Sequence, residues 1–148
     1  MRAGRLRPSP GRILGTGGRG AAARAILLLV TAKDDLGRRG EQLVADHLEA
    51  AGWTIVDRNW RCSTGEIDIV ALDGRDLVIV EVKTRTSRDF GDPLAAVDDR
   101  KLTRLCVLAG RWRRAHRPRG VRGTRIDLVG VLMPRHAEPV IDHLRAAA

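Results

Sequence analysis

The sequence is poor in aromatic residues: it holds no tyrosine, one phenylalanine and three tryptophans in 148 residues. Stacking of unpaired bases on aromatic rings is therefore scarcely available, which disfavours single-strand readout. No apolar run approaches the ~20 residues that span a bilayer, so the sequence predicts no membrane partner. Two cysteines are too few for a disulfide framework and form no C-x-x-C pair, which argues against zinc and favours a reducing, cytoplasmic location.

Acidic residues are absent from the first 33 positions, which hold seven lysines and arginines among many glycines and alanines. Because this segment lacks periodic apolar spacing, we expect residues 1–33 to form a flexible leader and residues 34–148 to form the folded domain. A gene-model extension and a signal-peptide core at 25–30 are the alternatives that the sequence leaves open. The remaining residues carry 20 cations against 18 acids, so their charge alone identifies no partner.

Apolar periodicity predicts one helix, three strands, a second helix and one or two further strands. The helices are expected at about 35–51 and 99–116, and the strands at 53–60, 65–72, 76–85, 125–133 and 140–144. This order predicts an α/β three-layer sandwich in which helices flank a mixed central β-sheet. Gly37 and Gly40 weaken the first helix, but they would let another backbone or a substrate approach it closely.

Charged residues recur on one face of the second and third strands, which are otherwise nearly all apolar. A hairpin loop at Gly74–Arg75 would place Asp68 opposite Glu81. A turn one residue earlier would instead pair Glu66 with Glu81, and in both registers these acids and Lys83 share a face. Clustered carboxylates repel each other, and Mg²⁺ would relieve the repulsion because it takes oxygen ligands from a few carboxylates. A simple Glu81–Lys83 ion pair is the structural alternative.

Glu41 projects from the packed side of the first helix, one turn inside its apolar stripe. It either reaches toward the metal site of the sheet or is an acid favoured by the dipole at the start of the helix. The sequence leaves both readings open.

Asp68, followed after twelve residues by Glu81-Val82-Lys83, resembles the core of the PD-(D/E)xK nucleases. The surrounding sequence is more specific. It contains the segments Gly40-Glu41, Asn59-Trp60-Arg61, Gly65-Glu66-Ile67-Asp68 and Val80-Glu81-Val82-Lys83-Thr84-Arg85. Together these segments resemble the YraN-like family of small bacterial proteins, which is grouped with Holliday-junction-resolvase-like and restriction-endonuclease-like folds. The resemblance covers about residues 36–144. It departs from the wider nuclease pattern at Ile67, where many nucleases have proline.

The resemblance implies a restriction-endonuclease-like fold and an endonuclease that uses Mg²⁺ or Mn²⁺ to hydrolyse duplex or branched DNA. The catalytic group that it implies has three carboxylates and one lysine: Glu41, Asp68, Glu81 and Lys83. The carboxylates and the Val82 carbonyl would ligate the metal, and the lysine would orient or deprotonate the attacking water. Glu66 and Thr84 would surround and support these groups.

Basic residues that could follow DNA phosphates are concentrated between positions 100 and 126, where ten cations occur without an acid. The residues expected to contact the backbone are Arg85, Arg100, Lys101, Arg104, Arg111 and Arg114. The same stretch also fits a solvated basic helix and loop. Branched DNA needs two cuts, which favours a homodimer. The alternative function is a nucleic-acid-binding or adaptor protein with a vestigial site, acting with recombination, repair or DNA-uptake proteins.

Overall fold

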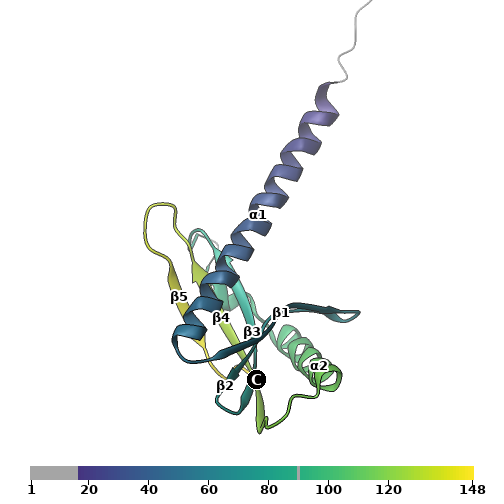
Figure 1. Cartoon of the computed structure of the whole chain (residues 1–148). Helices are drawn as coiled ribbons and strands as arrows, with labels where there is room; N and C mark the ends of the chain where they lie inside the picture. Colours follow the sequence, from purple (N-terminus) through teal and green to yellow (C-terminus); the bar gives the residue numbers. More distant parts are fainter. Residues whose placement is uncertain (1–16, 90) are drawn as a thin grey trace, which may run out of the picture. The chain divides into compact units, whose positions relative to one another are not determined.

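The computed structural model describes residues 17–89 and 91–148, and Figure 1 shows the order of its elements. The described chain divides into two units, with the boundary between Ala32 and Lys33. The first helix, α1 (Gly17–Ala50), begins well before the start near residue 35 that the sequence predicts. The segment at 21–29 is rich in alanine and leucine, which have high helix propensity. Positions 17–33 of the expected flexible leader are therefore helical, and positions 1–16 lie outside the described residues.

Five strands form one mixed sheet in the sequential order β1-β2-β3-β4-β5. The strands are β1 (Thr54–Cys62), β2 (Gly65–Asp73), β3 (Asp76–Arg85), β4 (Gly123–Leu132) and β5 (Val140–Leu144). β3 and β4 pair in parallel, and the other neighbouring strands pair antiparallel. The chain between β3 and β4 includes the 3-10 turn η1 (Pro93–Ala96) and the helix α2 (Asp99–His116). The predicted α/β class with a mixed sheet is thus confirmed. Among the described residues, no helix is long and apolar enough to cross a membrane.

The β2–β3 hairpin has the predicted two-residue loop at Gly74–Arg75. Gly74 adopts a φ of 60°, the left-handed conformation that a tight hairpin turn requires. Ile69 pairs with Val80 in the resulting register. The ladder ends at this pair, and just beyond it the Asp68 carboxylate accepts the Val82 backbone N–H at 2.8 Å and lies close enough to Glu81 for their charges to interact. Of the two registers that the sequence left open, the one with the earlier turn does not occur.

Each face of the sheet carries its own apolar core, because successive side chains of a strand point to opposite faces. One core joins α1 to the sheet through Val44, Leu48, Ile69, Val78, Val80 and Val129, and the other joins α2 to it through Leu105, Leu108, Trp112, Val70, Ile79 and Ile126. Residues 33–50 of α1, the sheet and α2 are therefore three packed layers. The start of β2 and the end of β3 lie between the two helical layers.

The helix α1 lies against β3 at Gly40, which is buried. A Cβ atom at this position would overlap the Thr84 hydroxyl and lie 2.9 Å from the Thr84 Cβ. The expectation that a glycine permits close approach is therefore confirmed at Gly40, whereas a Cβ at Gly37 would meet nothing within 4 Å. The close contact holds the following residue, Glu41, near the end of β3.

Candidate functional site

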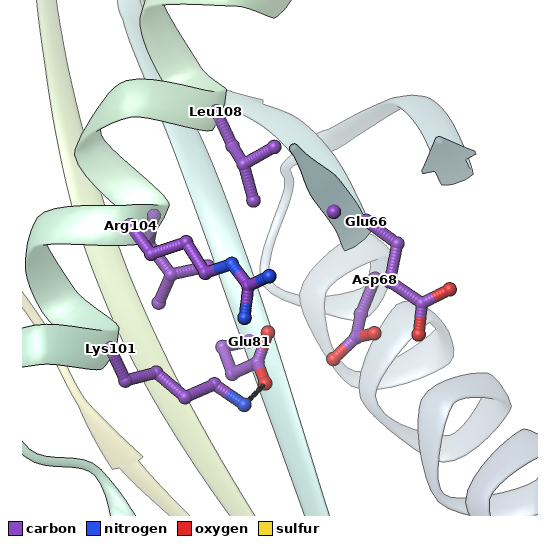
Figure 2. Close-up of a pocket in the computed structure, with 8 residues that line it drawn as sticks. Glu66, Asp68, Glu81, Lys101, Arg104 and Leu108 are labelled. Carbon is purple, nitrogen blue, oxygen red and sulfur yellow. Dashed lines mark ion pairs between the residues drawn. The ribbon is translucent and has the colours of Figure 1, made fainter. Parts of the chain in front are cut away.

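A cleft of about 240 Å³ opens between the start of β2, the end of β3 and one face of α2 (Figure 2). We call it the acidic cleft, and it is lined by Gly65, Glu66, Asp68, Glu81, Lys101, Arg104, Leu105 and Leu108. It contains three of the four residues that the strand register predicted on one face, namely Glu66, Asp68 and Glu81. The hairpin register thus brings acids that are far apart in the sequence into one site.

Asp68 is the most unusual of these acids because it is only 9% exposed. Within the described part of the chain its carboxylate accepts one hydrogen bond, from the Val82 backbone N–H at 2.8 Å, and has no cationic partner within 4 Å. Burial, and secondly the charge of Glu81, raise the pKa of Asp68 to about 7. A carboxylate in this condition gains stability from a bound proton or a bound cation.

Glu81 forms an ion pair with Lys101, which extends from the first turn of α2 into the cleft (Figure 2). The side chain of Asp98 caps this turn by accepting the Lys101 backbone N–H at 2.9 Å. The sequence predicted that Lys101 contacts phosphates, but here it pairs with Glu81. The Glu81–Lys83 ion pair, which the sequence left as an alternative, does not occur among the described contacts. The helical spacing that puts Lys101 on the face of Leu105 and Leu108 was the available signal for its place in the cleft.

Arg104 and Arg111, two further residues predicted to contact phosphates, bond to the β1–β2 turn. Arg104 Nε donates to the Thr64 carbonyl at 3.1 Å, and an Arg111 guanidinium nitrogen lies 3.3 Å from the Ser63 hydroxyl. These contacts fasten the turn to α2 and so support the wall of the acidic cleft at Gly65. A phosphate would have to compete with these contacts for the two guanidinium groups.

Glu41 lies in a second cleft, of about 400 Å³, which shares Glu66 with the acidic cleft. Burial raises the pKa of Glu41, although the Asn59 side chain and the Arg58 charge oppose this effect. Glu41 in turn helps to raise the pKa of Asp68. It is therefore electrostatically coupled to the predicted metal ligands, but it borders their cleft instead of lining it.

Lys83 lines a third cleft, of about 500 Å³, at the end of β3 and the adjoining part of α1. We call it the cationic cleft, and it is lined by Lys33, Leu36, Gly37, Val82, Lys83, Thr84, Arg85 and Thr86. Burial, reinforced by the charges of Arg85 and Lys101, lowers the pKa of Lys83, while Glu81 opposes the shift. Lys83 thus adjoins the acids along β3 without lining their cleft.

Oxygen donors at the acidic cleft suit a hard divalent cation. Asp68 and Glu81 belong to adjacent strands, and the backbone N–H of Val82, which follows Glu81, donates to Asp68. Mg²⁺ commonly binds through one or two protein carboxylates and takes its remaining ligands from water and phosphates. In the described ranges, no group of three or more His, Cys, Asp or Glu side chains is arranged to hold a metal. Asp68 and Glu81 are two carboxylates that the acidic cleft could offer to such an ion.

Together these features define a class of small α/β protein in which a buried aspartate and a half-buried glutamate meet at one end of a mixed sheet. The chain matches the model of the uncharacterised protein family UPF0102 over residues 40–131. It is 54% identical over 119 residues to a UPF0102 protein of Paenarthrobacter aurescens, which covers 80% of this chain and 98% of that protein. A UPF0102 protein of an Arthrobacter species is 57% identical over 114 residues, covering 77% and 96% of the two chains. The corresponding protein of Streptomyces coelicolor is 51% identical over 120 residues, covering 80% and 92%.

The chain therefore belongs to the UPF0102 family, which confirms the resemblance to YraN-like proteins. The matched range includes every acid of the candidate site as well as Lys83 and Lys101.

Proposed function

We propose that this protein is a divalent-metal-dependent phosphodiesterase that hydrolyses the backbone of nucleic acid, with duplex or branched DNA as its substrate. The observation that carries this proposal is the Asp68 carboxylate, which is buried beside Glu81 with one hydrogen bond. Burying a carboxylate without a compensating partner costs folding free energy. A site that has to bind a cation accounts for that cost.

Asp68 and Glu81 would hold the cation through their carboxylate oxygens, with the Val82 carbonyl beside them. A bound divalent cation supplies Lewis-acid activation of water and offsets charge on the phosphodiester. Lys83 orients the attacking water or takes its proton, and its lowered pKa brings the neutral form closer to physiological pH. The water oxygen bonds to phosphorus, the bridging P–O bond breaks, and the departing oxygen keeps the electron pair and takes up a proton.

The remaining polar residues have supporting roles in this proposal. Glu41 would hydrogen-bond water at the border of the acidic cleft, and Glu66 would keep the cleft negative where the two clefts meet. Lys101 would leave Glu81 when the carboxylate takes up a cation, and its ammonium would then be available to a phosphate. Thr84, which contacts α1 at Gly40, would hold the end of β3 in place.

The test incubates purified protein with branched, nicked and linear DNA in Mg²⁺ or Mn²⁺, alongside the variants Asp68→Asn and Lys83→Ala. The matched control is Asp46→Asn, which removes an exposed carboxylate of α1. We expect wild type and the control to cleave, and both cleft variants to lose at least a hundredfold in rate. Equal cleavage by all four proteins would mean contamination and would refute the proposal.

A nucleic-acid-binding or adaptor protein with a vestigial site is the second candidate. The observation that favours it is the Lys101 ion pair, which already neutralises one of the two ligand carboxylates. Calorimetric titration with Mg²⁺ or Mn²⁺ separates the two functions. Binding that is lost in Glu81→Gln supports the phosphodiesterase, whereas DNA binding without any metal binding supports the vestigial site.

A further inference from the structure

The cations of α2 are largely occupied by contacts within the protein. Lys101 pairs with Glu81, and Arg104 and Arg111 bond to the β1–β2 turn. Arg113 donates to the Thr124 hydroxyl at 2.8 Å. A phosphate that approached α2 would have to compete with these partners, so this helix is a weaker anion site than its charge count indicates.

The cationic cleft presents the opposite condition. Lys33, Lys83 and Arg85 line it, no acid does, and within the described residues none of these three side chains has a hydrogen-bond or ion-pair partner. The hydroxyls of Thr84 and Thr86 add two uncharged donors. At about 500 Å³, the cleft is also larger than the acidic cleft, which holds about 240 Å³. Unpartnered cations and hydroxyl donors in a roomy cleft suit an anion.

The strand β3 connects the two clefts, because Glu81 lines one and the residues from Val82 onward line the other. A strand rises about 3.3 Å per residue, so the backbone positions of Lys83 and Arg85 lie roughly 7 and 13 Å beyond Glu81. Phosphates along one DNA strand recur about every 3.4 Å of helix axis. Because Lys83 serves at the bond itself in the proposed function, Arg85 is the strand cation placed to meet a phosphate that flanks a bond held at the acids.

We propose that the cationic cleft binds the backbone phosphates that flank the scissile bond, so that nucleic acid enters over the end of β3 and Lys33 instead of along α2. This inference rests on the proposed function, because it assumes that the acidic cleft holds the reacting phosphodiester. Of the residues that the sequence predicted to contact phosphates, it retains Arg85, adds Lys33 and Thr86, and gives α2 a secondary role.

The experiment measures the affinity of the full chain for a fluorescently labelled duplex by anisotropy, in EDTA to prevent cleavage, over a range of salt concentrations. The variants are Lys33→Ala, Arg85→Ala and their combination, and Arg85→Lys retains the charge. The matched controls are Arg100→Ala and Arg114→Ala, which remove exposed cations of α2. Thermal melts of every variant verify folding.

Each cleft alanine should lower the slope of log affinity against log salt by about 0.9 and weaken binding roughly fivefold near physiological salt. The double variant should show about twice the change in slope, Arg85→Lys should restore the slope, and the two controls should match wild type. Equal slopes for wild type and the cleft variants, with a loss in the α2 controls, would overturn this inference and leave the proposed function intact. A wild-type protein that binds no DNA would overturn both. Binding of a mononucleotide as tightly as the duplex would overturn the inference too, because a single phosphate would then suffice.

Discussion

Asp68 on β2 and Asp127 on β4 are both buried, with 9% and 0% exposure, yet their surroundings differ completely. Asp127 accepts hydrogen bonds from Arg125 Nε at 3.1 Å and from the Ala146 backbone N–H at 3.0 Å, and His143 Nε2 lies 2.8 Å from it. Burial acts to raise the pKa of Asp127, but these partners outweigh burial and lower it. Asp68 has one N–H donor, and burial and Glu81 raise its pKa to about 7.

The difference indicates that Asp127 is a structural acid, whereas Asp68 is available to a ligand. Asp127 links β4 to the C-terminal segment through the Ala146 N–H. Its neighbour on β4, Arg125, also pairs with Asp73 and lies over the Trp53 ring, 5.0 Å from the ring centre. The charge of Asp127 is therefore compensated by contacts within the fold. Asp68 is similarly shielded from bulk water, but its charge is left uncompensated at the wall of a cleft. The two aspartates should therefore act with opposite sign on stability.

Asp127→Asn should have the largest effect and lower the free energy of unfolding by about 3–5 kcal/mol. The substitution leaves the Arg125 guanidinium and His143 without the buried carboxylate that they contact. Urea denaturation at pH 7 measures the loss. The matched control, Asp142→Asn, removes a half-buried acid with one long contact to Arg88 at 3.6 Å and should change stability by less than about 0.5 kcal/mol. A loss below about 1 kcal/mol in Asp127→Asn would contradict the structural role.

Asp68→Asn should have the opposite sign and raise the free energy of unfolding by roughly 2–4 kcal/mol at pH 8 in EDTA. Because the pKa of Asp68 is raised in the folded state, the native protein binds a proton more tightly than the unfolded chain between about pH 4 and pH 7. Wild type therefore loses stability as pH rises through this window, and the asparagine, which still accepts the Val82 N–H, does not. The gain of Asp68→Asn over wild type should disappear below about pH 4. A variant that is less stable than wild type at pH 8 would refute this assignment.

Divalent cations should stabilise wild type through Asp68 but not through Asp127. At a Mg²⁺ concentration ten times the dissociation constant, the expected gain in unfolding free energy is about 1.4 kcal/mol. The same increment should appear in Asp127→Asn, on a lower baseline, and be absent in Asp68→Asn. Urea titrations with and without Mg²⁺ measure it, with Ca²⁺ and high NaCl as tests of nonspecific ionic effects. An increment retained in Asp68→Asn would show that the ion binds elsewhere.

The position of the acids on the strands was predictable because it depends on local rules. Alternation of apolar residues identified β2 and β3, and the Asp73-Gly74-Arg75 turn limited their register to two choices. In both of them an acid of β2 faces Glu81 on the same side of the sheet. The same kind of local reasoning indicated that Gly40 allows close approach to α1. Each of these inferences involves neighbours in one hairpin or one helix.

Contacts between layers could not be predicted in the same way. The pairing of Lys101 with Glu81, and the separation of Lys83 into another cleft, depend on how α2 and α1 lie on the two faces of the sheet. Asp127 was not identified, although an acid among the apolar residues of β4 gives the same signal as Glu81 does in β3. The early start of α1 was missed because helix propensity at 21–29 outweighed the absence of an apolar stripe.

Lys101→Met should have the smallest effect and tighten divalent-cation binding about fivefold, which corresponds to roughly 1 kcal/mol, the upper range for a partly exposed ion pair. Lys101 and a metal ion compete for the same Glu81 carboxylate, and methionine keeps much of the length of the side chain while removing its charge. Calorimetric titration with Mg²⁺ or Mn²⁺ gives the affinity. Arg114→Met, an exposed position on the same helix, should leave it unchanged and so exclude a general effect of net charge. Weaker binding in Lys101→Met would mean that the lysine supports the ion site, and the contrast with Asp127, whose partners hold it within the fold, would then fail.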